Sequence, residues 1–505
     1  MSRKLISLFL CLAPMVLSAQ TFTHYTSVDN AFWQESRIKL TSKAPKTTPL
    51  LTISGDEKGM EFKAWGTCFN ELDLDAIKLL KETEQKDIMK MLFSPQGDLR
   101  FTRGRLTMNA NDYSREWYSC SDVWGDLELK YFNIEHDKEN VIQLIRMAQR
   151  EQPQLTFWMS PWSPPTWMKI NGDYPVLSSR YNKMDKRQDY LLYSDEAKVD
   201  PDEMKLLGDR NGVFPRRLAT KDYFIQDPAY LQAYANMFCR FIELYKQEGI
   251  PIDMVMYQNE AYSYTPYPGC AWTAEGTVRF NHDYLAPTLR QKHPEVHLYL
   301  GTFNTNRLDY VDKIVGQLQG DVEGLGFQWE ARENLDHFRQ HYPQLRLIQT
   351  ESECGNGSMD WPAGEHTFGL MCDYIGRGCE EYYIWNFILT GNGQSPWGWR
   401  QNALIQVDQQ KKTYRLTPEY FAVKHFARFV EPGSRMVAYK ASPETPVIAF
   451  VTPGGKRIII AGNFASEPKP ISVNLGKRNL ASTLPPHSFH TFVEKNKQAF
   501  ILIFG

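Results

Sequence analysis

The sequence predicts an α/β protein in which a (β/α)8 TIM barrel is followed by a small C-terminal all-β, sandwich-like domain. Between residues 61 and 432, eight short apolar runs alternate with helical patterns, and strands that alternate with helices form a parallel sheet. From residue 433 to 495, β-type runs follow one another with only turns between them. The length of 505 residues exceeds one ordinary core, so a large domain with a smaller companion is expected.

The predicted barrel strands are short and mostly apolar, because strands of a parallel barrel are buried on both faces. In chain order they are Phe62 to Gly66, Leu99 to Leu106, Leu155 to Met159, Met254 to Tyr257, Leu298 to Gly301, Gly324 to Phe327, Leu345 to Ile348 and Tyr382 to Phe387. Two helices between or after them have clear start signals. Asp227-Pro228 supplies an N-cap and a first-turn proline for a helix that ends at Gly249, and Thr417-Pro418 repeats this signal.

The remaining segments complete the predicted layout. Residues 160–226 are too long for a simple connection, and an insertion of this size at the catalytic face of a barrel is expected to shape a substrate cleft. Residues 20–60 are expected to add strands to the β domain, and residues 496–505 form a tail with no assigned role. The predicted strands of the C-terminal domain are Val447 to Val451, Arg457 to Phe464, Ile471 to Leu475 and Phe489 to Val493.

Residues 1–19 have the pattern of a secretory signal peptide. Arg3 and Lys4 precede an apolar stretch that ends near Leu17, and Ser18-Ala19 offers a small-residue cleavage site. The apolar stretch is too short to span a bilayer, and no other long apolar segment follows. The sequence therefore predicts a protein that is exported to a periplasm or to the cell exterior and has no membrane span.

Composition argues against several classes of function. The chain has 57 basic and 59 acidic residues, a net charge of −2, which does not suggest a nucleic acid or an anionic membrane surface as a partner. Its cysteines show neither a disulfide framework nor the spacing of a zinc site, and phosphate-loop, dinucleotide and HExxH motifs do not occur. No cofactor and no metal are expected, and the oligomeric state is left open.

Two glutamates indicate the chemistry. Glu260 and Glu351 each stand at the end of a short apolar run, and catalytic side chains of (β/α)8 barrels lie where the strands end. A pair of carboxyl groups is the minimum equipment of a glycosidase, in which one exchanges a proton with the glycosidic oxygen and the other attacks the anomeric carbon or activates water. The chain also has 13 tryptophans, many in loops, where indole rings can stack on sugars.

Five motifs in the same order resemble those of glycoside hydrolase family 30, the glucosylceramidase-like enzymes. The motifs are Ser160 to Lys169 with Asn171-Gly172, Gln258-Asn259-Glu260, Thr350-Glu351, Tyr383 to Asn386, and Tyr420 to Phe429 with Pro432-Gly433-Ser434. The resemblance implies a retaining enzyme in which Glu260, after strand four, is the acid/base and Glu351, after strand seven, is the nucleophile. It also implies substrate-binding residues, namely Asn259 on the sugar 2-hydroxyl, Arg105 near the nucleophile, Asp112 on the terminal sugar, Trp162, Trp329 and Trp385 around the subsite, and Asn402 at its mouth.

Several alternatives stay open at this stage. Glu353 competes with Glu351 as nucleophile, since side chains two residues apart on a strand point the same way. Gln328-Trp329-Glu330 replaces the His-Trp-Tyr of glucosylceramidase-like members, and this change argues against a lipid-linked glucosyl substrate. The expected substrate is a carbohydrate, a β-glucan with β-1,6 linkages first, or a β-glucoside. A β-xylosidase or xylanase, a glucosylceramidase and a non-catalytic carbohydrate-binding protein are the alternatives.

Overall fold

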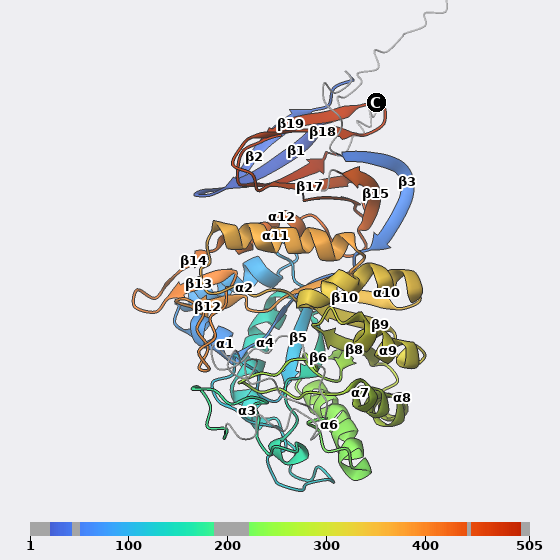
Figure 1. The fold of residues 1–505 in the computed structure, drawn as a ribbon. Coiled ribbons are helices and arrows are strands. Elements are labelled where there is room, and N and C mark those ends of the chain that lie inside the picture. The colour runs from blue at the N-terminus through green and yellow to red at the C-terminus, as the bar shows by residue number, and fades with distance from the viewer. Residues whose placement is uncertain (1–20, 43–50, 186–221, 442–445, 496–505) are drawn as a thin grey trace, which may run out of the picture.

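The computed structural model describes residues 21–42, 51–185, 222–441 and 446–495. A parallel barrel forms the larger part, and a β-sheet unit lies against two of its helices, α11 and α12 (Figure 1). The predicted signal peptide and the predicted tail lie outside the described residues. Among the helices that the structure describes, none is both long enough and apolar enough to cross a membrane.

The barrel has eight parallel strands, which confirms the predicted fold class. Their order around the sheet is β10-β9-β8-β7-β6-β5-β4-β11, so neighbours in the chain are neighbours in space. Each strand overlaps one of the eight predicted runs. The strands are β4 (Ala64–Cys68), β5 (Arg103–Met108), β6 (Thr156–Pro161), β7 (Ile252–Met256), β8 (His297–Phe303), β9 (Gly324–Gln328), β10 (Arg346–Glu351) and β11 (Glu381–Ile384).

A glutamine side chain joins the two ends of this sheet. Between β10 and β11, the Glu380 N–H donates to the Leu347 carbonyl at 2.8 Å. The Gln349 carboxamide then takes the place of a neighbouring backbone group. It donates to the Tyr383 carbonyl at 3.1 Å and accepts from the Tyr383 N–H at 2.5 Å. The side chain therefore satisfies two buried backbone groups and completes the barrel.

Helices surround the barrel and begin where the capping signals predict. The Asp227 carboxylate accepts from the Ala229 N–H at 2.8 Å at the start of α6, and the Thr417 hydroxyl caps α12. The helices are α1 (Glu71–Lys78), α2 (Glu82–Phe93), α3 (Glu135–Glu139), α4 (Val141–Glu151), η1 (Thr166–Met168), α6 (Pro228–Gln247), α7 (Ala274–Arg279), η3 (Phe280–Leu285), α8 (Ala286–Lys292), α9 (Leu308–Leu318), η4 (Trp329–Asn334), α10 (Leu335–His341), α11 (Trp361–Gly376) and α12 (Pro418–Ala427).

A compact apolar plug fills the centre of the barrel. It consists of six side chains, none more than 2% exposed, and they are Trp158, Met254, Met256, Tyr299, Ile348 and Tyr383. Burying a large apolar side chain contributes roughly 1.5–3 kcal/mol, so the plug holds the strands at fixed positions. The guanidinium of Arg105 lies 4.7 Å above the ring of Trp158. The plug therefore forms the floor of the polar site at the strand ends.

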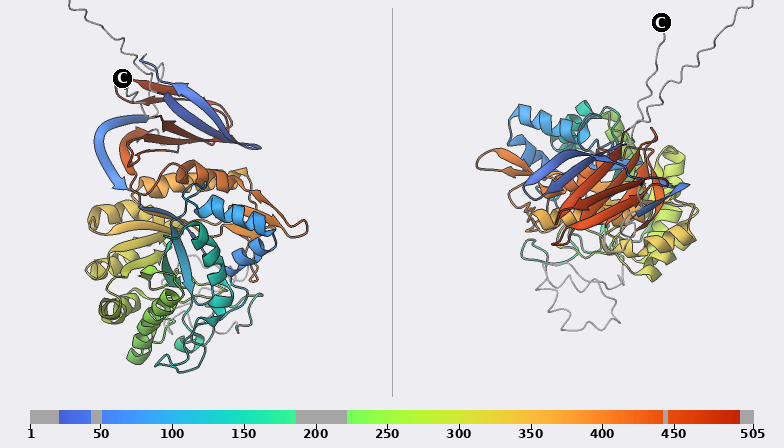
Figure 2. Two further views of the ribbon diagram at one scale, coloured as in Figure 1. Left: turned by 180° about the vertical axis from the view of Figure 1, so that it is seen from behind. Right: turned by 90° about the horizontal axis from the view of Figure 1, so that it is seen from above.

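The second unit is a nine-stranded sheet made from both ends of the chain. Its order is β19-β18-β3-β15-β16-β17-β20-β1-β2. Reciprocal backbone hydrogen bonds of 3.0 and 2.8 Å between Thr41 and Asn479 link the segment after β2 to β19, so the sheet curls into two layers (Figure 2). The strands are β1 (Thr21–Val28), β2 (Ala31–Lys39), β3 (Leu51–Glu61), β15 (Arg435–Ala441), β16 (Val447–Val451), β17 (Arg457–Asn463), β18 (Lys469–Asn474), β19 (Asn479–Leu484) and β20 (Ser488–Glu494).

Aromatic and histidine side chains join the two units. Phe32 of β2 stacks on Phe421 of α12 with ring centroids 4.1 Å apart. The imidazole of His425 contacts the Thr491 hydroxyl at 2.8 Å and the Ser27 hydroxyl at 2.9 Å. A small sheet of β12 (Ile388–Thr390), β13 (Ile405–Asp408) and β14 (Thr413–Leu416) fills the connection between β11 and α12.

Candidate active site

The two glutamates occur at the same end of the barrel. Glu351 is the last residue of β10, and Glu260 follows β7 in a loop where its own backbone adopts a positive φ of 48°. Counted from β4, β7 is the fourth barrel strand and β10 is the seventh. The two carboxyl groups are close enough to interact, because the charge of Glu260 adds to burial in raising the pKa of Glu351. The strand ends thus bring both carboxyl groups into one polar pocket.

Arg105 links the two halves of this pocket. Its guanidinium is fully buried, and it donates from Nη1 to the Glu351 carboxylate at 2.7 Å and from Nη2 to the Asn259 carboxamide oxygen at 2.7 Å. Further bonds reach the Ser160 hydroxyl at 3.2 Å and the Thr350 carbonyl at 3.3 Å. Because an arginine only donates, these contacts fix the orientation of the Asn259 side chain as well as the position of Glu351.

Neutral donors surround Glu260 instead. Gln328, at the end of β9, donates to Oε1 at 2.7 Å, and the Ser263 hydroxyl donates to Oε2 at 2.8 Å. The Glu260 N–H donates to the Thr302 hydroxyl at 3.1 Å. Gln328 lies in register with Glu351 on the neighbouring strand. Glu260 therefore shares the pocket with Glu351 but has no direct hydrogen bond to a cation among the described residues.

Burial raises the pKa values of the carboxyl groups in the pocket. For Glu351 burial raises the pKa to about 7, although the Arg105 guanidinium opposes the change. For Glu260 burial again raises the pKa, and the hydrogen bonds from Ser263 and Gln328 oppose it. Asp112 has a pKa well above its usual range because of burial and the nearby charges of Glu351 and Glu260. Burial and the proximity of the three acids therefore both oppose their simultaneous ionisation.

Aromatic rings enclose the pocket. Trp162 and Trp385 stack with centroids 5.0 Å apart, and the Arg105 guanidinium lies 4.5 Å from the ring of Trp162. Among the described residues, the indole N–H of Trp385 and one carboxyl oxygen of Asp112 are buried without a hydrogen-bond partner. Buried polar groups are nearly always paired, so these two indicate a place where a polar ligand supplies the missing bonds.

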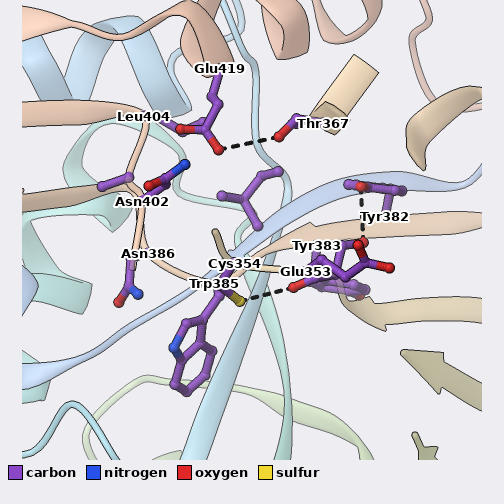
Figure 3. A pocket seen from close by; sticks show the side chains of 13 residues that line it. Glu353, Cys354, Thr367, Tyr382, Tyr383, Trp385, Asn386, Asn402, Leu404 and Glu419 are labelled. Atoms are coloured by element: carbon purple, nitrogen blue, oxygen red, sulfur yellow. Dashed lines mark hydrogen bonds between the residues drawn. The ribbon is translucent and has the colours of Figure 1, made fainter. Parts of the chain in front are cut away.

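Asn402 lies against the loop that follows Glu351, where its N–H donates to the Cys354 carbonyl at 2.7 Å. Its carboxamide oxygen accepts from the Gly357 N–H at 2.8 Å and the Met359 N–H at 3.4 Å, so it holds the loop that follows β10. Figure 3 shows it between Trp385 and Glu419, beside a cavity of about 40 Å³. Burial raises the pKa of Glu419 to about 8. A contact of Asn402 with substrate stays a prediction.

Glu353, the competitor for the nucleophile role, is engaged elsewhere. Its carboxylate bonds to the Arg332 guanidinium and, at 2.6 Å, to the His366 ring. The hydrogen bond from His366 and the charge of Arg332 lower its pKa. Glu353 is thus held in an ion-pair network with η4 and α11, whereas Glu351 contacts Arg105.

Several polar contacts in the pocket were not predicted from the sequence. Gln328, Ser263 and Thr302 contact Glu260 or its backbone, and the Cys354 thiol donates to Glu351 at 3.6 Å. Gln328 and Thr302 did carry a usable signal, because each stands at or near the end of an apolar run as the two glutamates do. Ser263 and Cys354 lie in irregular loops, where the sequence pattern gives no indication of direction.

A wide cleft lies near the pocket, and its lining residues Trp397 and Trp399 pack against the cluster that contains Trp162 and Trp385. It has a volume of about 570 Å³ and is lined by Arg180, Tyr181, Trp397, Trp399, Arg400 and Asn356, among others. The ring of Trp399 meets that of Tyr267 edge-on at 5.8 Å. Tyr267 also belongs to the same apolar cluster as Trp162 and Trp385, so it connects the cleft to the aromatic walls of the pocket. The cleft therefore offers aromatic and polar groups to a ligand larger than one sugar.

Comparison with known proteins finds relatives that span most of the chain. The chain is 23% identical over 520 residues to the lysosomal acid glucosylceramidase of Mus musculus, covering 95% of this chain and 91% of that protein. It is 21% identical over 436 residues to the endo-1,6-β-D-glucanase neg1 of Aspergillus fumigatus, covering 83% of this chain and 82% of that protein. The solved structure of the endo-β1,6-glucanase BT3312 superimposes with a TM-score of 0.73 at 19% identity, covering 94% of this chain and 99% of that one.

Two family models divide the chain between them. The Glycosyl hydrolase family 30 TIM-barrel domain matches residues 62–188 and 223–430, and the Glycosyl hydrolase family 30 beta sandwich domain matches residues 433–492. The first covers the barrel with its pocket of paired carboxyl groups, and the second covers the C-terminal strands of the nine-stranded sheet. The chain therefore belongs to glycosyl hydrolase family 30 and is a glycoside hydrolase.

Proposed function

We propose that the protein is a retaining β-glycosidase that cleaves a β-glucan, with β-1,6-glucan as the first candidate. The observation that supports it most is the unequal environment of the two carboxyl groups. Glu351 is bonded to a buried cation, while Glu260 is bonded to neutral donors. Pairs of acids whose surroundings differ in this way commonly divide the roles of base and acid between them.

The proposed reaction has two steps. In the first, a Glu351 carboxylate oxygen attacks the anomeric carbon, the bond to the leaving oxygen breaks, and Glu260 gives its proton to that oxygen. In the second, Glu260 takes a proton from water as the water oxygen attacks the same carbon and releases Glu351. Two inversions leave the configuration unchanged. Asn259, oriented by Arg105, is proposed to bind the 2-hydroxyl.

The substrate class rests on the relatives and on one departure from them. Two fungal relatives are named endo-1,6-β-D-glucanases, and a solved structure of similar fold is that of an endo-β1,6-glucanase. The chain differs from the glucosylceramidase-like pattern at Gln328-Trp329-Glu330, where it places an amide beside Glu260. We therefore favour a glucan over a glucosyl lipid. The wide cleft with Trp397 and Trp399 is suited to an extended chain. Export through the signal peptide of residues 1–19 belongs to the same proposal.

The test combines a substrate panel with variants of the three glutamates. The purified protein is incubated with β-1,6-, β-1,3- and mixed-linkage glucans and with xylan, and reducing-sugar release is measured. We expect hydrolysis of β-1,6-glucan, no turnover above background for Glu351→Gln, and a loss of about 10²–10⁴-fold for Glu260→Gln. Glu353→Gln is the matched control, because Glu353 lies two residues from Glu351 in ion pairs outside the pocket, and it should retain activity.

Two further measurements separate the roles. Proton NMR of the first product should show the β-anomer before mutarotation; an initial α-anomer would rule out the retaining mechanism. Azide added to Glu260→Ala should restore turnover of a dinitrophenyl β-glucoside, whose leaving group needs no proton, and give a β-glycosyl azide, since azide can attack the glycosyl-enzyme without a general base. Full activity of Glu351→Gln on every substrate that the wild type cleaves would refute the assignment of the nucleophile.

A further inference from the structure

The two carboxylate oxygens of Glu260 have hydrogen-bond partners of different kinds. Oε1 accepts from the Gln328 amide at 2.7 Å, and Oε2 accepts from the Ser263 hydroxyl at 2.8 Å. An amide N–H can only donate, whereas a hydroxyl can donate or accept by rotating. The two oxygens therefore differ in their ability to hold a proton, provided that the orientation of Gln328 is fixed.

A chain of contacts fixes that orientation. Arg105 has only donors, so the atom of Asn259 that meets its Nη2 at 2.7 Å is the oxygen. The same Asn259 oxygen lies 3.0 Å from the Thr302 hydroxyl and 3.4 Å from Gln328 Nε2. If Gln328 turned over, its own oxygen would face the Asn259 oxygen. In the observed orientation, the Gln328 oxygen Oε1 also accepts from the Thr350 hydroxyl at 2.9 Å. The buried guanidinium thus determines that Gln328 presents an N–H to Glu260.

Ser263 has the opposite character. Its oxygen accepts from the Asn304 amide at 2.5 Å, which leaves the hydroxyl hydrogen to donate to an ionised Oε2 and a second lone pair to accept from a protonated Oε2. The hydroxyl can therefore follow the proton as Glu260 changes its state. Asn304, Ser263 and Oε2 form one continuous chain of hydrogen bonds on the side of Glu260 away from Gln328.

We propose that Gln328 is a positioning residue that confines the transferable proton of Glu260 to Oε2, because its fixed N–H makes Oε1 a permanent acceptor. The proposal rests on the acid/base role given to Glu260 above. It also explains what the amide does at this position. A permanent donor stabilises the ionised form of Glu260, which is the form that must abstract a proton from water in the second step.

The other charges near Glu260 do not depend on Gln328. The titratable or charged groups that face Glu260 are Arg105 on β5, Glu351 on β10, and Asp112 and Tyr267 in loops. A substitution at Gln328 removes one hydrogen bond and leaves these four groups in place. Its effect on the titration of Glu260 can therefore be measured separately from the ion pair of Arg105 and Glu351.

The test is the pH dependence of kcat/KM for Gln328→Met on a β-glucoside with a poor leaving group. Loss of activity at high pH reports deprotonation of the acid in the free enzyme. Removing a donor to the ionised form raises that pKa, so the basic side of the profile should move up by about 1–2 pH units. With a dinitrophenyl glucoside, whose leaving group needs no proton, kcat/KM should show no such shift.

Matched variants make the outcome specific. Gln328→His restores an N–H and should bring the basic side back toward the wild-type pH. Gln328→Glu, close to the native shape, sets a second carboxyl 2.7 Å from Oε1. The basic side of the profile should then move to a still higher pH, because two carboxyl groups this close share a proton. Gln344→Met, at an exposed glutamine before β10, should change nothing. Melting temperatures verify that the variants are folded.

The outcomes separate this proposal from the one on which it rests. If the wild type hydrolyses no glycoside, or if Glu260→Gln leaves the basic side of the profile intact, the acid/base assignment fails. If the wild-type profile depends on Glu260 but Gln328→Met and Gln328→Glu leave it unmoved or move it down, the confinement of the proton is refuted. An equal shift in Gln328→His and Gln328→Met would refute it as well.

Discussion

Replacing Arg105 by methionine tests the electrostatic basis of the site. Methionine keeps the length and apolar stem of arginine but removes the cation that bonds Glu351 and Asn259 at 2.7 Å each. Breaking a buried ion pair by removing one partner costs about 3–5 kcal/mol of stability, because the remaining charge is buried without compensation. The pKa of Glu351, already raised to about 7 by burial against the opposing charge of Arg105, should rise further.

This change should be visible in both activity and stability. The nucleophile must be ionised, so activity is lost as pH falls through the pKa of Glu351, and this acidic side of the profile should move to higher pH in Arg105→Met. A carboxyl group whose pKa is higher in the folded state than in the unfolded chain favours folding at low pH and loses that contribution as pH rises. Relative to wild type, the variant should therefore be least destabilised near pH 5 and most destabilised near pH 8.

Arg103 provides the control from the same strand. It lies two residues before Arg105, at the opposite end of the barrel, and it pairs with Asp253 and with Glu381 at 3.6 Å. Arg103→Met should also lower the melting temperature but leave the acidic side of the activity profile at its wild-type pH. If Arg105→Met keeps the wild-type profile, or loses equal stability at pH 5 and pH 8, the electrostatic account of Glu351 is wrong.

Two other predictions concern the fold. Gln349→Met removes both hydrogen bonds that close the barrel at Tyr383. It leaves a buried N–H and a buried C=O unpaired, at a cost of about 1–3 kcal/mol each. Urea unfolding should show a lower midpoint, and an unchanged midpoint would contradict the role of Gln349 in closing the barrel. His24 lies 2.9 Å from His490, and burial lowers the pKa of His24 to about 4. Because the unfolded chain binds a proton at this residue more readily than the folded protein does, the free energy of unfolding should decrease as the pH falls from about 6.5 to 4. Melting temperatures should fall over that range and fall less in His24→Phe.

The barrel strands were predictable because parallel strands bury both faces and so appear as continuous apolar runs. The exact ends of these strands were less predictable. The run from Leu99 to Leu106 predicted one strand, whereas β5 begins only at Arg103. Leu99 and Phe101 are fully buried, but they fill the core from a turn. Apolar composition reports burial and does not report which residues join the hydrogen-bonded ladder.

The β-sheet unit was predictable only in part, because its pairing is non-local. The four predicted C-terminal runs correspond to β16, β17, β18 and β20. Strands β15 and β19 were not predicted, and neither was the position of β3 between β15 and β18. Strand β3 pairs antiparallel with one neighbour and parallel with the other. Such a choice depends on the packing of segments about 380 residues or more apart in the chain, and local patterns contain no information about it.

The paired glutamates could be found from sequence because an acid at the end of a buried strand is unusual. The division of roles between them depends instead on how many cations lie beside the carboxyl groups in the folded pocket. Glu351 and Asp112 are buried in one pocket, Glu260 is partly buried there, and Arg105 is the only cation bonded to any of them among the described residues. One guanidinium compensates one carboxylate, and it contacts Glu351 directly. Under the proposed roles this is the arrangement that the first step needs, since an ionised nucleophile and a protonated acid must coexist at one pH. Removing the cation should therefore affect both glutamates together, even though it touches only one.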